Sequence, residues 1–215
     1  MSSAANIAVS TKSELTRSKL VDAGIELFSR FGYEATSTRQ VQEHAGVQRN
    51  LITYHFGSKE LFWKACMEDL FGRLNEVITP AIEQSMDIEP EERIRFLIRR
   101  FVRVSAAHPE STRIMFDEGR SNDWRLEWLV EQFARPFFET LSQLYASSGL
   151  NRRSSPSMIQ FYYLLVSSAS VYAMAPEYHK LSGEDPFDEE RIDQHANMIA
   201  DLLTRSFLSD QEKVQ

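Results

Sequence analysis

The apolar positions along most of the chain recur every three to four residues, which is the spacing of one face of an α-helix. The first clear stripe of this kind consists of Leu20, Ala23, Leu27 and Phe31. It stops at Gly32, a residue type that often follows the last turn of a helix because it adopts positive φ at little steric cost. We therefore expect an amphipathic helix that ends near Gly32.

A second, shorter helix is predicted directly afterwards. Ser37 and Gln40 have the spacing of a capping box, in which each side chain bonds a backbone N–H group at the start of a helix. This helix should therefore begin at Thr38. It should end at Gly46, where a turn with positive φ forms readily.

The remaining pattern is also helical. Further helices are expected at residues 48–55, from Ser58 to about Pro80, and near 90–107, 109–118, 123–148, 156–175 and 188–208. Pro136 should kink or shorten the helix over 123–148, because proline lacks the N–H group that a helix interior requires. No alternating pattern of a strand competes with these helices. The fold class is therefore predicted to be all-α.

Two short helices joined at Gly46, with a longer helix before them, have the pattern of a helix-turn-helix unit. The apolar residues expected to fix the angle between the two short helices are Val41, Ala45, Val47 and Ile52. The polar residues left facing outward at the start of the second one are Gln48, Arg49, Asn50 and Thr53. In such proteins this end of the helix enters the major groove, where arginine can bind guanine and glutamine or asparagine can bind adenine. These four residues are therefore candidates for reading the bases of double-stranded DNA.

Candidate contacts to the DNA backbone surround the same unit. Contacts with phosphates fix the register of a protein on DNA without reading its sequence. The residues suited to this role are Thr38, Arg39, Tyr54, His55 and Lys59. The net charge of −7 argues at first against a nucleic-acid partner, but residues 1–60 carry a balance of +1 and residues 61–215 one of −8. The acidic excess therefore lies outside the helix-turn-helix unit.

Residues 16–62 resemble the DNA-binding domain of TetR-family transcriptional regulators. The matching segments are LFSRFGYEATSTRQV, then HAGV, and then YHFGSKELF, in this order and closely spaced. The resemblance covers about a fifth of the chain. It implies a three-helix DNA-binding domain joined to a larger helical domain that dimerises and usually binds a small molecule, with repression relieved by the ligand as the usual sign of control.

The resemblance also implies roles by position. It assigns the DNA backbone to Arg39, Tyr54, His55 and Lys59, and the bases to Gln48, Arg49, Asn50 and Thr53. Three positions depart from the family pattern: a serine or threonine cap is common where Gln48 stands, a small or polar residue where Leu51 stands, and an aromatic residue where Thr53 stands. Glutamine is a poor N-cap, so we interpret Gln48 as a residue that reads DNA. The operator sequence cannot be taken from any relative.

Two stretches in the C-terminal part have the pattern of helices that pair. Residues 161–173 contain a group of small side chains, which permit close approach of another helix, and an apolar stripe runs along residues 192–207. The residues predicted to form a homodimer interface are Ser168, Ala169, Tyr172, His195, Ile199 and Leu203. A two-fold dimer is expected because one short recognition helix covers only a half-site. The alternative is that both stripes face the chain's own core.

The middle of the chain is rich in aromatic residues, methionine and arginine, which suit an apolar pocket with a few polar anchors. The predicted lining residues are Phe96, Arg100, Met115, Phe116, Glu118, Trp124, Trp128, Phe133, Phe137 and Tyr163. Each of them also suits core packing or a solvated face. A small-molecule effector of unknown identity is expected to bind here and to shift the dimer towards or away from the geometry that fits the operator.

No pattern in the chain indicates catalysis, a cofactor or a metal site. Cys66 is the only cysteine and has no obvious base beside it in sequence, and the five histidines lack the spacing of metal ligands. A single cysteine fits a reducing compartment. The N-terminal residues lack the apolar segment of a signal peptide, and no apolar run approaches the ~18 residues of a membrane span. We therefore expect a soluble, cytoplasmic protein that is not an enzyme.

The expected domains are a disordered N-terminal tail (1–12), a helix-turn-helix DNA-binding domain (13–57), a helical regulatory and dimerisation domain (58–208) and a C-terminal tail (209–215). The expected function is that of a TetR-like regulator, in this family usually a repressor, that binds a palindromic operator as a homodimer and responds to a small molecule. A helical enzyme and a DNA-binding protein without an effector are the alternatives.

Overall fold

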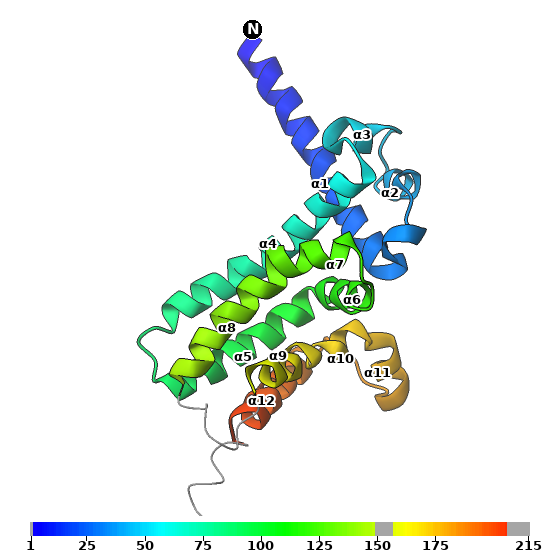
Figure 1. The fold of residues 1–215 in the computed structure, drawn as a ribbon. Helices are drawn as coiled ribbons and strands as arrows, with labels where there is room; N and C mark the ends of the chain where they lie inside the picture. The colour runs from blue at the N-terminus through cyan, green and yellow to red at the C-terminus, as the bar shows by residue number, and fades with distance from the viewer. Residues whose placement is uncertain (1, 149–156, 206–215) are drawn as a thin grey trace, which may run out of the picture. The chain divides into compact units, whose positions relative to one another are not determined.

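The computed structural model of the chain describes residues 2–148 and 157–205 (Figure 1). The described residues form helices and no strands, which confirms the all-α prediction. The helices are α1 (Ser2–Ala35), α2 (Thr38–His44), α3 (Leu51–Phe56), α4 (Lys59–Gln84), α5 (Pro90–Ala107), α6 (Pro109–Glu118), α7 (Trp124–Leu129), the π-helix η1 (Val130–Ala134), α8 (Arg135–Ser147), α9 (Met158–Ser167), α10 (Ser170–Ala173), α11 (Ala175–Ser182) and α12 (Glu189–Arg205). They form two compact units, Met1–Arg73 and Leu74–Gln215, and the boundary between the units falls within α4.

The core of the first unit consists of apolar side chains from α1, α2, α3 and the first part of α4. Its buried residues include Leu20, Phe28, Val41, Ile52, Phe62, Trp63, Cys66 and Met67. The predicted stripe on α1 is buried at Leu20, Ala23 and Leu27, but Phe31 is 54% exposed. A Cβ atom at Gly24 would lie only 2.5 Å from Phe62 Cζ and 2.6 Å from Cys66 Sγ. The absence of a side chain at position 24 therefore allows α1 and α4 to approach closely.

The helical path of α1 breaks at Gly32, as the sequence predicts. Gly32 has φ 75° and ψ 171°, outside the helical region. The hydroxyl of Thr36 donates to the carbonyl oxygen of Gly32 (2.8 Å) and also lies 3.2 Å from that of Leu27. Because Thr36 is only 2% exposed, these contacts satisfy its buried hydroxyl and tie the residue to the break at Gly32.

The second unit has its core around α5, α8, α9 and α12, and α12 packs along α5 (Figure 1). One apolar cluster consists of Ile94, Ile98, Leu141, Tyr145, Phe161, Leu165, Ala200 and Leu203, and a second of Val102, Ala106, Tyr172 and Ala196. Arg95 and Arg103 of α5 form ion pairs with Asp201 and Asp193 of α12. The two helices therefore match in charge as well as in apolar surface.

The helix predicted over 123–148 is divided into α7, η1 and α8. Pro136 lies in the first turn of α8, where a missing N–H group is tolerated, and the wider π-helical turns of η1 come directly before it. The predicted disturbance at Pro136 is thus a change of helix type. The pattern predicted over 156–175 is likewise divided between α9 and α10, and α11 has no counterpart in the prediction.

α1 begins at Ser2, where the sequence pattern predicts a disordered tail over 1–12. The boundary predicted after residue 57 coincides with the start of α4, whereas the compact units divide further along that helix. The C-terminal tail predicted over 209–215 lies outside the described residues.

No single helix in the described part of the chain combines the length and the hydropathy of a membrane span. The bent pair Met158–Ala173 and Ala175–Ser182 meets both criteria only when taken together.

Candidate nucleic-acid interface

α2 begins with the predicted capping box. The backbone N–H of Ser37 donates to Gln40 Oε1 (2.8 Å), and that of Gln40 donates to Ser37 Oγ (3.2 Å). α2 is followed by a turn at Ala45 and Gly46, and Gly46 has φ 64°. Other residue types rarely adopt this conformation, so the prediction of Gly46 as the turn residue is confirmed.

α3 (Leu51–Phe56) begins later than predicted. Gln48 and Arg49 precede it, and its N-cap is Asn50, with φ 67°. Asparagine is one of the few residue types besides glycine that tolerate this left-handed conformation. The prediction that Gln48 starts the helix is therefore wrong, and its poor capping tendency says nothing about its role.

A buried side chain of α2 caps α3. Asn50 makes no capping hydrogen bond through its side chain. Instead, Gln42 Oε1 accepts from the backbone N–H of Ile52 (3.2 Å), while Gln42 Nε2 donates to the carbonyl oxygen of Thr38 (3.0 Å). Because Gln42 is only 5% exposed, its bond with Ile52 joins α3 to α2 away from solvent, and its bond to Thr38 within α2 holds the Gln42 side chain in place.

The four predicted base-reading residues are exposed and close together in sequence and structure. Gln48 and Arg49 lie before α3, Asn50 is its N-cap and Thr53 lies on its first turn. Ile52, which lies between them, is 1% exposed and anchors the helix in the core. These four residues therefore form one polar surface at the start of α3, which we call the recognition surface: Gln48, Arg49, Asn50 and Thr53.

The predicted backbone-contact residues flank the recognition surface. Arg39 and Tyr54 are exposed, and Thr38, His55 and Lys59 are half-buried. The ammonium group of Lys59 lies 4.2 Å from the centroid of the Tyr33 ring, a cation–π distance. The rings of Tyr54 and His55 meet edge to face with their centroids 5.0 Å apart. These contacts orient polar and cationic groups of the kind that bind phosphates.

Two carboxylates pair with basic residues of α2 and of the turn. Glu43 Oε1 accepts from Arg39 Nε at 2.8 Å and lies 4.0 Å from Arg49 Nη2. Glu26 of α1 lies with its Oε2 atom 2.8 Å from His44 Nε2. The hydrogen bond from Arg39 lowers the pKa of Glu43, and the hydrogen bond with His44 lowers that of Glu26. Both carboxylates are therefore ionised at neutral pH.

Aromatic rings connect α3 with α1 and α4. The Phe56 and Phe62 rings have centroids 4.9 Å apart, and the Arg17 guanidinium lies 5.1 Å from the Phe56 centroid. Ser58 Oγ accepts from the backbone N–H of Leu61 (3.1 Å), so the predicted cap of α4 is confirmed. Phe56, at the C-terminal end of α3, thus contacts both α1 and α4.

Three residues that shape this region, Arg17, Gln42 and Glu43, are absent from the sequence-based prediction. The four-residue spacing of Arg39 and Glu43 on a predicted helix is a signal that could have identified Glu43. Gln42 and Arg17 carry no comparable local signal, because their partners lie on other elements.

The predicted ligand-pocket residues do not gather around one cavity. A narrow apolar cavity of about 30 Å³ lies in the second unit, between the end of α4 and helices α5, α8 and α9. Its walls include Ile82, Ile98, Phe101, Phe137, Thr140 and Leu165. Among the predicted pocket residues, Phe137 lines this cavity.

The other predicted pocket residues lie elsewhere in the second unit. Arg100, Phe116 and Tyr163 are exposed, Phe96, Met115, Trp124, Trp128 and Phe133 are half-buried, and Glu118 is buried. Glu118 Oε2 accepts from Arg125 Nε at 2.8 Å, and both residues are less than 10% exposed. The charge of Glu118 is therefore balanced within the chain.

The residues predicted for the dimer interface lie largely in the chain's own core. Ser168, Ala169, Tyr172 and Leu203 are buried, and His195 and Ile199 are half-buried. His195 Nε2 lies 2.9 Å from the carbonyl oxygen of Ser168, a contact within one chain. Of the small side chains in residues 161–173, Ser168 and Ala169 are thus buried within a single chain.

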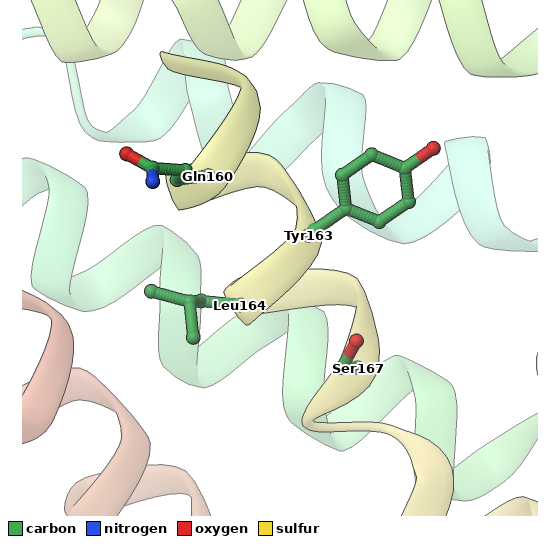
Figure 2. A pocket seen from close by; sticks show the side chains of 4 residues that line it. All are labelled: Gln160, Tyr163, Leu164 and Ser167. Carbon is green, nitrogen blue, oxygen red and sulfur yellow. The ribbon is translucent and has the colours of Figure 1, made fainter. Parts of the chain in front are cut away.

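Other residues of the same helices expose apolar surface. These are Ile159, Tyr163 and Leu164 on α9 and Met198 and Leu202 on α12, each about half exposed. Tyr163 and Leu164, together with Gln160 and Ser167, line an open hollow on α9 (Figure 2). We call the five exposed apolar residues the α9–α12 patch: Ile159, Tyr163, Leu164, Met198 and Leu202.

Comparisons with known proteins agree with the geometry of the first unit. The family model described as bacterial regulatory proteins, tetR family, matches residues 20–66. The chain is similar to the HTH-type transcriptional dual regulator CecR of Shigella flexneri, with 27% identity over 213 residues that cover 92% of this chain and 95% of CecR. It is also similar to the HTH-type transcriptional regulator RutR of Escherichia coli, with 30% identity over 95 residues, 44% of this chain and 43% of RutR.

Solved structures share the fold over nearly the whole chain. The crystal structure of AibR in complex with isovaleryl coenzyme A and operator DNA matches with a TM-score of 0.69 and 14% identity. The match covers 88% of this chain and 98% of AibR. Similarity at this level of identity concerns the fold alone.

Proposed function

The chain belongs to the TetR family of DNA-binding transcriptional regulators, and from this premise we propose that it represses transcription as a homodimer bound to a palindromic operator. The observation that carries this proposal is the exposed recognition surface, which the buried residues Gln42 and Ile52 hold in place. One such surface covers a half-site, so two chains related by a two-fold axis bind two half-sites.

The roles of individual residues follow from their chemistry and exposure. Gln48, Arg49, Asn50 and Thr53 read bases in the major groove, and Thr38, Arg39, Tyr54, His55 and Lys59 contact the DNA backbone. Residues 13–57 then form the DNA-binding domain, and residues 58–208 form the regulatory and dimerisation domain.

An electrophoretic mobility shift experiment tests the DNA-binding function. The probes are DNA from upstream of the gene for this chain and a random duplex of equal length, each at two salt concentrations. We expect tighter binding to the upstream DNA and a steep loss of affinity with salt, because phosphate contacts release counterions. Equal, weak binding to both probes would contradict the proposal.

The α9–α12 patch supports the homodimer. Its apolar side chains stay exposed to solvent in a single chain, and burial between two chains would remove that apolar area from water. The patch lies on the pair of helices that the sequence pattern predicts for the interface, although on other residues of those helices.

The apolar cavity supports control by a small molecule. Its walls are apolar apart from the hydroxyl of Thr140, and it lies within the second unit. A space of about 30 Å³ holds little more than one or two water molecules, so an effector must widen it. AibR, which has the same fold, is bound to isovaleryl coenzyme A and operator DNA in its crystal structure. A thermal-shift screen of small metabolites that includes short acyl thioesters tests this part of the proposal.

Coupling between effector and operator takes the form of a population shift. An effector that prefers one spacing of the two DNA-binding domains changes the fraction of dimers that fit the operator. α4 is one continuous helix that includes residues of both compact units. It therefore offers a direct mechanical connection between effector and DNA.

We further propose that the chain is not an enzyme and acts in the cytoplasm, where its DNA partner lies. The burial of Cys66 supports the first point, because burial raises the pKa of its thiol. A buried thiol with a raised pKa is a poor nucleophile. The relatives described above are transcriptional regulators, which supports the same conclusion.

A further inference from the structure

A carboxylate lies among the arginines of the recognition surface and its flank. Glu43 Oε1 accepts a hydrogen bond from Arg39 Nε at 2.8 Å, and the same oxygen lies 4.0 Å from Arg49 Nη2. The side chains are 53%, 68% and 71% exposed for Glu43, Arg39 and Arg49. One carboxylate oxygen therefore accepts a hydrogen bond from Arg39 and forms a looser ion pair with Arg49, on a surface that is open to a large partner.

A negative charge at this position is unfavourable for DNA binding on simple electrostatic grounds. Phosphates repel a carboxylate, and Glu43 is ionised because the hydrogen bond from Arg39 lowers its pKa. Ion pairs as exposed as these are weak, so a better acceptor displaces Glu43 from either arginine. A phosphate is such an acceptor for Arg39, and the O6 and N7 atoms of guanine are such acceptors for Arg49.

We propose that Glu43 is a specificity-determining residue of the DNA interface, which holds Arg39 and Arg49 in the free protein. It yields Arg39 to a DNA phosphate and yields Arg49 only to DNA that presents a guanine at the position Arg49 reaches. On random DNA Arg49 keeps its contact with Glu43, and the carboxylate repels the backbone. On the operator both arginines find acceptors in the DNA. This role rests on the proposed DNA-binding function and adds to it a residue that acts through two others.

The substitution Glu43→Gln removes the charge and keeps the size of the side chain. We expect it to raise affinity for random DNA by roughly three- to tenfold and to raise affinity for the operator less, so that the ratio of the two falls. The slope of log K against log salt on random DNA should become steeper by about 0.9, the value for one added phosphate contact.

A matched control comes from a second ion pair of the same kind. Arg135 donates to Glu131 across the same four-residue spacing, at 2.8 Å from Nη2, and both residues are exposed in the second unit. Glu131→Gln therefore makes the same change in net charge and breaks the same type of pair in the unit that does not carry the recognition surface. It should leave the affinity ratio and the salt slope close to those of the wild type.

The experiment measures binding of the full chain to an operator duplex and to a random duplex over a series of salt concentrations. The operator duplex carries the site that the wild type protects upstream of its own gene. Five proteins are compared: wild type, Glu43→Gln, Glu131→Gln, Arg49→Ala, and Glu43→Gln combined with Arg49→Ala. Since Glu43 acts on base reading through Arg49, its substitution should change the ratio much less when Arg49 is already absent.

Two results would overturn this role of Glu43. An unchanged ratio and salt slope in Glu43→Gln would mean that the carboxylate restrains neither arginine. Weaker operator binding with unchanged random binding would mean that Glu43 itself accepts a hydrogen bond from a base. A wild type without operator preference would instead overturn the proposed function, and this result is visible before any variant is compared.

Discussion

Arg49 and Lys59 are both basic residues of the first unit, but their surroundings predict different effects of substitution on DNA binding. Arg49 is 71% exposed before α3, where its fork of donors can reach a base edge. Arg49→Ala should cost roughly 1–3 kcal/mol on the operator and relax preference at one base pair. Lys59→Ala should weaken binding to all sequences alike, since a phosphate contact carries no sequence information.

Competition binding with a set of operator variants distinguishes these outcomes. Arg120, which is exposed in the second unit, supplies the control Arg120→Ala, with the same change in charge and no expected effect on preference. An Arg49→Ala protein that discriminates between operator and random DNA as well as the wild type does would rule out base reading by Arg49.

Gln42 offers a second prediction at the residue scale. Gln42→Leu leaves the buried N–H of Ile52 without its acceptor, and such a group costs about 1–3 kcal/mol. The urea midpoint of unfolding should fall accordingly, and operator affinity should fall with it because α3 loses its cap. Gln143→Leu, on an exposed position of α8, is the control and should change stability by less than about 0.5 kcal/mol. Equal midpoints for both variants would show that Gln42 does not hold α3.

The sequence predicts the structural roles of Ser37, Gln40 and Gly46, because the partners of the first two and the backbone conformation of the third are local. The bond from Gln42 to Ile52 spans ten positions and exists only after α2 and α3 have folded against each other. Asn50 was expected to read DNA but also forms the left-handed N-cap of α3. No local pattern before it distinguishes these two uses of an asparagine.

At the scale of the element, the contact between α1 and α4 depends on a glycine. Gly24→Ala would place a methyl group 2.5 Å from Phe62 and 2.6 Å from Cys66, both fully buried. Overpacking of this kind costs roughly 1–3 kcal/mol, which exceeds the gain of about 1 kcal/mol from replacing a helical glycine. We therefore expect a net loss of stability of up to about 2 kcal/mol.

Gly72 provides the matched control for Gly24. It lies on α4 in the same unit, and a Cβ atom there would meet nothing within 4 Å. Gly72→Ala should therefore stabilise the protein by roughly 0.5–1 kcal/mol. Denaturant unfolding of both variants measures the difference, and a stabilised Gly24→Ala protein would contradict the close packing of α1 on α4.

Helix boundaries agree with the sequence-based prediction where a proline restricts the backbone at the start of the helix. α5 and α6 have the predicted bounds because Pro90 and Pro109 start them and the residue before a proline disfavours helix. The division of 123–148 into α7, η1 and α8 depends on how the turns before Pro136 pack, and hydrophobic spacing does not distinguish a π-helix from an α-helix. α11 is short and follows a break at Met174, and its helical pattern is correspondingly weak.

At the scale of the whole molecule, the α9–α12 patch predicts the oligomeric state. Leu164→Glu combined with Leu202→Glu puts two charges on the patch, and burying a charge without a partner is strongly unfavourable. The dimer dissociation constant should rise by at least roughly tenfold for each substitution, and operator affinity should fall as dimers are lost. Sedimentation velocity at micromolar concentration measures the first effect.

Leu181→Glu is the control for this pair, since Leu181 is 83% exposed on α11 outside the patch. It should sediment as the wild type does. A wild type that is monomeric at micromolar concentration, or a double variant that remains dimeric, would contradict an interface on the α9–α12 patch.

The sequence predicts the helices of the second unit but not which of their faces point inward. The sequence pattern predicts Tyr172 and Leu203 at an interface, yet both are buried within the chain. Apolar and small residues suit a core and an interface equally, because both exclude water. The distinction becomes visible only when the packing of α5 against α12 fixes the rotation of each helix.

The burial of Cys66 has a consequence for experiment. It is the only thiol of the chain and is 0% exposed beneath α1, so a thiol-specific reagent can react only with molecules in which the first unit has opened. Under fast reclosing, the labelling rate is proportional to the population of the open form. The native chain thus carries a built-in reporter of local unfolding in its DNA-binding half, and slower labelling in the presence of DNA would measure how strongly the bound state closes that half.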